Sequence, residues 1–294
     1  MPARVLPGIG LFVLCAACAP GRAVVAEPTT TTASIRKSSP ALGLPPVDFN
    51  HPPRDYVTNQ VSHWTLFVES QMVQEDPDLA RRAMNRLNEK LVEAMAVLPA
   101  SASAPLRHLK FFLLYGEKSR HGGRNNGLQY FRKSAPDHNR HLDPRMASSI
   151  VIYSASNFVW LSEFWALKAL VHELAHAHHL EQWPERRADI YDAWAHAKEA
   201  GLYRNIQDDR GRTLSQGYAL QNHLEYYAEL SCIYFVNGNY YPFNRANLRH
   251  YDPRGFQLIE RLWGIRDGSV RPLQEKAGGR VVPHSAPTSR SKSE

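Results

Sequence analysis

The alternation of apolar and polar positions predicts β-strands in the first half of the chain. Residues 61–70, VSHWTLFVES, place Trp64, Leu66 and Val68 on one side with a period of two, which is typical of a strand with one buried face. Three further apolar runs, rich in branched and aromatic side chains, predict more strands; they span residues 106–116, 127–133 and 148–156.

Apolar residues spaced three and four positions apart predict helices, most of them later in the chain. The first predicted helix, residues 76–99, begins with Asp76 and Pro77 at capping positions. Its apolar stripe consists of Leu79, Ala83, Leu87, Leu91 and Met95. Further helices are predicted over residues 162–182, 185–201, 222–235 and 252–264. Because strands come first and helices last, we expect an α+β fold with a mainly helical C-terminal half.

The N-terminal residues 1–26 have the pattern of an export signal. Arg4 precedes an apolar run over residues 5–19 that is too short to span a bilayer. Two processing routes remain open: cleavage after Ala26, or lipidation of Cys18 in an imperfect lipobox. We therefore expect a bacterial protein that is secreted or that stays in the cell envelope, with a lipid anchor through Cys18 as the alternative.

The composition of two further segments sets the limits of the folded domain. Residues 27–55 and 273–294 are rich in Thr, Ser and Pro and poor in aromatic residues, so they cannot form a core of their own. We expect a disordered linker and a disordered tail. Residues 56–272 remain as one domain, long enough for a full hydrophobic core.

Charge and cysteine content narrow the possible functions. The net charge is +7, but residues 1–55 and 271–294 together contribute +5, which leaves +2 for the part between them. A nucleic-acid partner is therefore not expected, because phosphate binding needs a basic face on the folded surface. Cys232 is the one cysteine of the predicted domain, so no disulfide can form within it.

The strongest chemical signal is the segment LVHELAHAHH at residues 170–179. It contains the pattern H-E-x-x-H from His172 to His176 inside the predicted helix 162–182. Residues four apart lie on one helical face, so both imidazoles can bind one metal ion. Glu173 follows the first histidine and can accept a proton from water beside that ion.

A catalytic zinc ion needs a third protein ligand, which must come from elsewhere. The metzincin pattern is excluded, because His179 and Gln182 stand where that pattern has glycine and histidine. Glu225 and Glu229 lie one turn apart on a helix that is otherwise apolar and aromatic. One acid can bind the metal while the other accepts a hydrogen bond from a ligand histidine, and their spacing leaves open which does which.

The two segments together resemble a known family of zinc peptidases. HELAH is followed about fifty residues later by Y-x-x-x-N-x-x-E-Y-Y-A-E, as in the catalytic domain of anthrax toxin lethal factor and its relatives, the secreted Pro-Pro endopeptidases. The resemblance is clear over residues 165–182 and 215–236 and compatible from about 60 to 265. It implies a zincin-like α+β fold, in which a small mixed β-sheet packs on helices that include the active-site helix.

The same resemblance implies a role for each matching residue. His172, His176 and Glu225 would be the zinc ligands, and Glu173 the general base. Tyr218, seven residues before Glu225, would stabilise the oxyanion of the scissile carbonyl, and Glu229 would support a ligand histidine. The large additional domains of lethal factor have no counterpart here, so the resemblance does not identify a target protein.

These observations predict an exported zinc metallopeptidase that hydrolyses peptide or protein substrates. The alternative is a non-catalytic envelope protein or lipoprotein that zinc merely stabilises. The cleavage preference and the oligomeric state do not follow from the sequence. Other candidates are set aside: His178 and His179 are expected to face away from the metal, His138 and His141 to be solvated in a loop, and Cys232 to be a small buried residue.

Overall fold

The computed structural model describes residues 47–265 and confirms the α+β fold class. The predicted export signal with both of its processing sites lies outside the described residues, as do residues 27–46, 266–272 and the predicted tail over 273–294. Among the helices of the described part, none combines the length and the apolar character needed to cross a bilayer.

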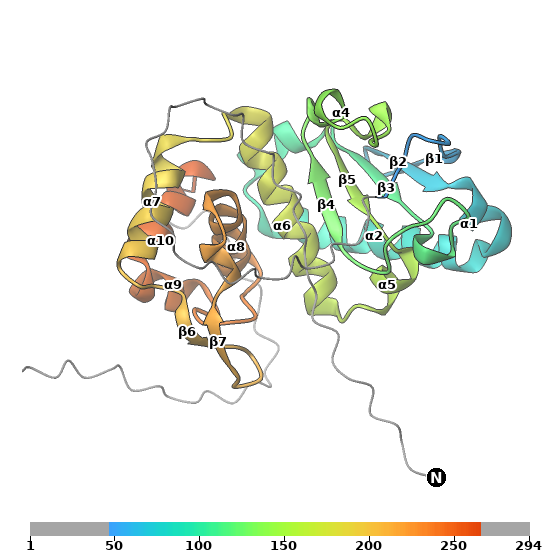
Figure 1. The fold of residues 1–294 in the computed structure, drawn as a ribbon. Coiled ribbons are helices and arrows are strands. Elements are labelled where there is room, and N and C mark those ends of the chain that lie inside the picture. The colour runs from blue at the N-terminus through green and yellow to red at the C-terminus, as the bar shows by residue number, and fades with distance from the viewer. Residues whose placement is uncertain (1–46, 266–294) are drawn as a thin grey trace, which may run out of the picture.

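A small mixed β-sheet lies in the N-terminal half of the described chain (Figure 1). Its strands lie in the order β1-β2-β3-β5-β4, with antiparallel outer pairs and parallel inner pairs. They span β1 Tyr56–Val61, β2 Trp64–Glu69, β3 Lys110–Leu113, β4 Leu128–Phe131 and β5 Ser149–Ile152. β4 is therefore an edge strand with one side free of sheet partners.

The two faces of the sheet are covered by different parts of the chain. One set of alternating side chains from β2, β3 and β5 joins the main hydrophobic core together with α2 (Pro77–Val97) and α6 (Glu163–Gln182). The opposite face carries Phe112 and Val151, which pack in a smaller cluster with Phe49. The period of two along each strand thus sends half of its side chains toward α6 and half away from it.

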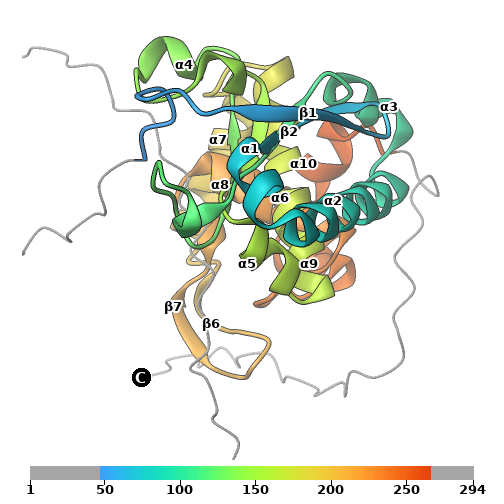
Figure 2. The same ribbon diagram turned by 90° about the vertical axis from the view of Figure 1, so that its right-hand side faces the viewer.

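Helix α6 lies between the sheet and the helical C-terminal half (Figure 1). That half contains α7 Ala188–Glu199, α8 His223–Phe235, α9 Arg245–Tyr251 and α10 Pro253–Leu262. An antiparallel hairpin, β6 Arg204–Gln207 with β7 Thr213–Gln216, projects from it (Figure 2). The shorter helices are α1 Ser70–Glu75, α3 Ala100–Ser103, α4 Ala135–His138 and α5 Ala155–Trp160.

The sequence explains why α6 is a long, central helix. The side chain of Ser162 caps its start by accepting a hydrogen bond from the backbone N–H of Trp165 at 3.3 Å. No glycine or proline interrupts the helix, and Pro184 follows its end. Every residue from Ala166 to His179 is buried, as expected for a helix with packed structure on both sides.

The predicted helices agree with the structure more closely than the predicted strands do. The starts and ends of α2, α6, α8 and α10 fall within two residues of those predicted. The strand predicted over residues 61–70 is β2, which forms a hairpin with β1 and runs into α1. β1 escaped prediction because most of its side chains are exposed or half-exposed and polar, and so leave little apolar pattern.

Residues 47–55 belong by composition to the predicted linker, but they pack against the domain. Phe49 is buried in the smaller cluster. The guanidinium of Arg54, 1% exposed, donates from Nη1 to both carboxylate oxygens of Glu69 at 3.3 Å. An aromatic anchor and a buried ion pair hold this segment, although its prolines and polar residues suggested disorder.

The two histidines at the end of α6 are buried. The ring of His178 stacks on Trp263 with centroids 3.9 Å apart, and its Nδ1 accepts a hydrogen bond from the Tyr227 hydroxyl at 2.8 Å. His179 donates from Nε2 to the carbonyl of Pro184 at 3.1 Å, and its buried Nδ1 has no hydrogen-bond partner among the described residues. Burial therefore lowers the pKa of His179 to about 4.

This lowered pKa makes a prediction about acid stability. The unfolded chain binds a proton near pH 6.5 and the folded chain near pH 4, so the contribution of His179 is present above pH 6.5 and lost as the pH falls. His179→Gln keeps a donor for Pro184 but cannot titrate. When the pH is lowered from 6.5 to 4.5, the free energy of unfolding should decrease for both proteins. The decrease should be smaller for the variant than for the unaltered protein, by roughly 2 to 3 kcal/mol.

The measurement is urea unfolding of the metal-free proteins across this pH range. Metal-free protein is used so that metal release in acid does not enter the comparison. Parallel pH profiles for the two proteins would contradict the prediction.

Candidate metal centre

The candidate site lies where α8 packs along α6. The side chain of Asn222 caps α8, accepting hydrogen bonds from the backbone N–H groups of Leu224 and Glu225, both at 2.9 Å. Glu225 thus sits in the first helical turn, where the helix dipole favours a carboxylate. This cap sets the position of the carboxylate relative to the histidines of α6.

Three side chains from these helices direct one donor atom each toward a common point. Nε2 of His172 lies 3.1 Å from Nε2 of His176 and 3.0 Å from Oε2 of Glu225. The third separation, from Nε2 of His176 to Oε2 of Glu225, is 3.5 Å. The side chains of all three residues are at most 2% exposed.

These separations fit a tetrahedral zinc ion. Zinc binds imidazole nitrogen at about 2.0–2.1 Å, which places neighbouring donor atoms about 3.3 Å apart. The three measured distances bracket this value. In addition, Oε1 of Glu225 is buried without a hydrogen-bond partner among the described residues, a costly arrangement that a cation would relieve.

The charge balance of the site also favours a divalent cation. Glu173, Glu225 and Glu229 are buried together with one ammonium group, that of Lys168. Burial raises the pKa of Glu225, but the charge of His176 and hydrogen bonds with both histidines outweigh it and hold that pKa well below its usual range. The carboxylate is thus ionised, and a dication bound by the neutral imidazoles would supply the positive charge that the protonated imidazoles otherwise provide.

Glu173 is held beside the donor atoms by the edge of the sheet. Its Oε2 accepts a hydrogen bond from the backbone N–H of Tyr130 in β4 at 2.7 Å. Its Oε1 is buried with no partner among the described residues, so it can accept a proton from a bound molecule. Burial raises the pKa of Glu173, which brings the carboxylate closer to the range of a general base at neutral pH.

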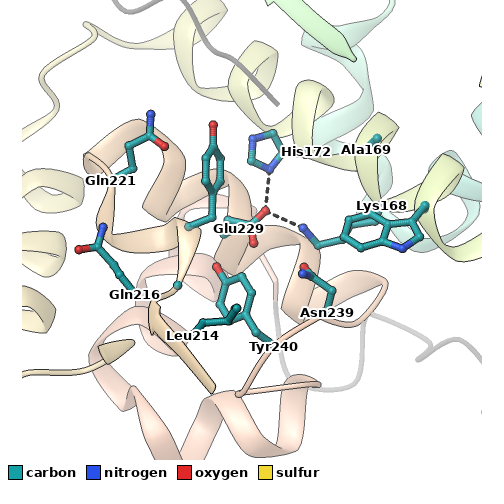
Figure 3. Close-up of a pocket in the computed structure, with 12 residues that line it drawn as sticks. Lys168, Ala169, His172, Leu214, Gln216, Gln221, Glu229, Asn239 and Tyr240 are labelled. Atoms are coloured by element: carbon teal, nitrogen blue, oxygen red, sulfur yellow. Dashed lines mark hydrogen bonds and ion pairs between the residues drawn. The ribbon is translucent and has the colours of Figure 1, made fainter. Parts of the chain in front are cut away.

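Glu229 occupies the other side of the His172 ring (Figure 3). Its Oε1 lies 3.0 Å from Nδ1 of His172 and 2.6 Å from the ammonium of Lys168. Burial raises the pKa of Glu229, but the charge of Lys168 and the hydrogen bond with His172 lower it to about 2. The ionised carboxylate can therefore accept a hydrogen bond from Nδ1–H of His172, which leaves Nε2 without a proton and able to bind a metal ion.

A second set of possible ligand atoms shares His172. Nδ1 of His172, a carboxylate oxygen of Glu229 and the thiol of Cys232 also lie within 4.8 Å of one another. The ammonium group of Lys168 forms an ion pair with that carboxylate and would repel a metal cation there. Among the described residues, no lysine or arginine forms an ion pair with Glu225, so the set formed with His176 and Glu225 is the better candidate for a metal site.

A cavity of about 380 Å³ opens beside His172 (Figure 3). It is lined by α6, β7, the short 3-10 helix Tyr218–Leu220 and residues that follow α8. Its aromatic and amide side chains are Trp165, Tyr218, Tyr240, Gln216, Gln221 and Asn239. The ring of Tyr218 lies 5.9 Å from that of His172, so Tyr218 forms part of the cavity wall next to this histidine.

The structure brings together the site residues that the sequence analysis selects. His172, His176 and Glu225 share the donor cluster, Glu229 contacts His172, and Tyr218 lines the adjacent cavity. The structure adds Lys168, which the sequence analysis did not select. It lies one helical turn before His172 on the same face, and a lysine within so apolar a helix was a sequence signal of a buried polar contact. The hydrogen bond from β4 to Glu173 has no signal in the sequence, because a backbone group makes it.

Comparison with known proteins adds no further assignment. No model of a known protein family matches the chain, and no curated protein matches it. Support for a function therefore comes from the arrangement of the buried side chains at the candidate metal centre.

The buried pair of Lys168 and Glu229 makes a prediction about stability. Lys168→Met leaves the Glu229 carboxylate without its ammonium partner, which should reduce the free energy of unfolding by about 3 kcal/mol. The double variant Lys168→Met with Glu229→Gln removes both charges and should recover part of this loss. Urea unfolding of the metal-free proteins measures the effect, and a double variant that is as unstable as the sum of the single variants would contradict it.

Proposed function

We propose that this chain is an exported, zinc-dependent metallopeptidase of the zincin type, similar to the catalytic domain of lethal factor and the Pro-Pro endopeptidases. One observation carries the proposal: the donor atoms of His172, His176 and Glu225 converge with tetrahedral spacing, and Glu173, the residue after His172 on α6, is buried with one oxygen that has no hydrogen-bond partner among the described residues. Three protein ligands leave a fourth position open for water or substrate, as catalytic rather than structural zinc sites do.

The assignment of the third ligand follows from the direction of the two acids. Glu225 approaches Nε2 of both histidines, whereas Glu229 approaches Nδ1 of His172. We assign Glu225 as the ligand and Glu229 as the residue that orients His172. When bound, zinc supplies Lewis-acid chemistry: it polarises a peptide carbonyl and lowers the pKa of water.

Glu173 is assigned as the general base. Its Oε2 is fixed by β4, so only Oε1 is free to take a proton from the attacking water. The protonated carboxyl can then deliver that proton to the nitrogen of the leaving amine. Because the hydrogen bond from β4 fixes one oxygen, the other has less orientational freedom, and less entropy is lost when the carboxylate reaches the geometry for proton transfer.

Tyr218 is assigned to the oxyanion, and the cavity to a substrate side chain. The phenol is a hydrogen-bond donor on the wall next to His172, where negative charge develops on the carbonyl oxygen. Lys168 and Glu229 neutralise each other at one wall of the cavity, and apart from His172 the other lining side chains are not ionisable at neutral pH. We therefore expect peptides with a large uncharged side chain beside the scissile bond.

The first test of the function is Glu173→Gln. This variant should keep zinc, because Glu173 is not a ligand, but its cleavage of a peptide library should fall by about 10²- to 10⁴-fold. Zinc content by atomic absorption and cleavage by mass spectrometry are measured together. Glu163→Gln, at the exposed start of α6, is the matched control and should cleave normally.

The same experiment separates catalysis from a purely structural zinc. Equal cleavage by the wild type and the Glu173 variant, or no cleavage by either, would exclude the peptidase proposal. Zinc without cleavage in both would instead favour a zinc-stabilised binding protein.

A second test concerns Tyr218→Phe. Loss of the phenolic donor should lower kcat by about 10²- to 10³-fold with little change in KM, because the hydrogen bond forms chiefly in the transition state. Tyr191→Phe, which alters a tyrosine of α7 outside the cavity, is the control. A change in KM at constant kcat would show that Tyr218 binds the ground state of the substrate rather than the oxyanion.

A further inference from the structure

A second group of possible metal ligands lies on the other side of the sheet. Asp48, His51 and His141 each offer one atom, and these atoms lie within 4.8 Å of one another. The flanking residues Phe49 and Leu142 belong to the smaller core cluster, on the face of the sheet opposite α6. This group is therefore separate from the site proposed for catalysis.

The carboxylate of Asp48 is oriented by its own turn. Its Oδ1 accepts hydrogen bonds from the backbone N–H groups of Asn50 and His51, both at 2.9 Å. The other oxygen, Oδ2, lies 2.7 Å from Nδ1 of His141 and 3.4 Å from Nδ1 of His51. Two imidazole nitrogens thus approach one carboxylate oxygen from segments about ninety residues apart.

Contacts that do not involve these side chains hold the two segments together. The backbone N–H of Phe49 donates to the carbonyl of His141 at 2.7 Å. The side-chain amide of Asn50 donates to the carbonyl of Arg140 at 3.4 Å. Phe49 itself is buried. The donor atoms are therefore brought close before any ion binds, which reduces the ordering that binding requires.

From the sequence, His141 is expected to be solvated, but its side chain is only partly exposed. Its side chain is 33% exposed and that of Asp48 29%, whereas His51 is 64% exposed. Such partial exposure lets an ion enter and keep water molecules as its remaining ligands. Arg140 donates from Nε to Nε2 of His141 at 3.4 Å, and because it is exposed it can turn away when that nitrogen carries the proton.

We infer that Asp48, His51 and His141 form a second binding site, for a divalent transition-metal ion such as Zn²⁺. Two imidazoles and one carboxylate are a ligand set that suits zinc, nickel and copper rather than calcium or magnesium. The ion takes the place of the proton on Nδ1 of His141, and the neutral imidazole then carries that proton on Nε2. Binding ties the segment before β1 to the loop between β4 and β5.

The test is a zinc titration of the full chain by isothermal calorimetry and equilibrium dialysis. The wild type should bind one zinc ion tightly and a second that dissociates more readily, as expected for an exposed site. His51→Ala and His141→Ala should each weaken the second ion by at least about tenfold and leave the first unchanged. His138→Ala, which removes an exposed histidine of the same loop, is the matched control and should bind both ions.

Hydrogen exchange gives an independent readout. Zinc beyond the first equivalent should slow the exchange of backbone amides in residues 47–54 of the wild type, but not in the His51→Ala variant. Because His51 is exposed, this substitution leaves the fold intact, so the difference reports on zinc binding. A wild type that binds one ion, or a His51→Ala variant that still binds two, would overturn the inference. Neither result bears on the Glu173 experiment, which concerns the separate site on α6.

Discussion

Negative charge buried between two helices is the constraint on which this structure depends. Three acidic side chains are buried on α6 and α8, with the ammonium group of Lys168 and the imidazoles of two histidines as their positive partners. An uncompensated buried charge costs several kcal/mol, so each acid must have a defined partner. Glu229 has Lys168 and His172, Glu173 has a backbone N–H of β4, and Glu225 faces two imidazoles.

This requirement links the two halves of the fold. The partner of Glu173 belongs to the sheet, and the partners of the histidines belong to the helical half, so α6 must be buried on both sides. A helix of this kind needs apolar residues around most of its circumference, and the sequence from Ala166 to Ala177 has them except where the polar cluster lies. The apolar packing and the polar cluster are thus set by the same helix.

The parts of the structure that the sequence predicts are those with strong local signals. The cap residues of α2 and the apolar spacing of α2 and α6 locate these helices, and the spacing of His172 and His176 predicts a pair of metal ligands. The choice of Glu225 over Glu229 as the third candidate came from the family resemblance and not from spacing. The sequence leaves β1 and the β6–β7 hairpin unpredicted, because their side chains are largely exposed and their position depends on pairing with another strand.

Contacts between distant segments escape prediction for a related reason. The anchoring of residues 47–55 depends on Phe49 entering a cluster built by other strands and on Arg54 meeting Glu69. The approach of His141 to Asp48 likewise joins segments about ninety residues apart. Neither contact leaves a periodic pattern, so only the folded chain reveals it.

The walls of the cavity beside His172 come from elements that differ strongly in burial. One wall is α6 and α8, where any change disturbs the buried acids. The opposite wall includes Leu214 and Gln216 of the projecting hairpin, which are at least partly exposed and touch none of the donor atoms. Mutations in the hairpin can therefore reshape the cavity while the candidate metal ligands stay in place. If the proposed activity holds, evolution could change what the protein recognises without first losing its chemistry, and an engineer could use the same separation to redirect its selectivity.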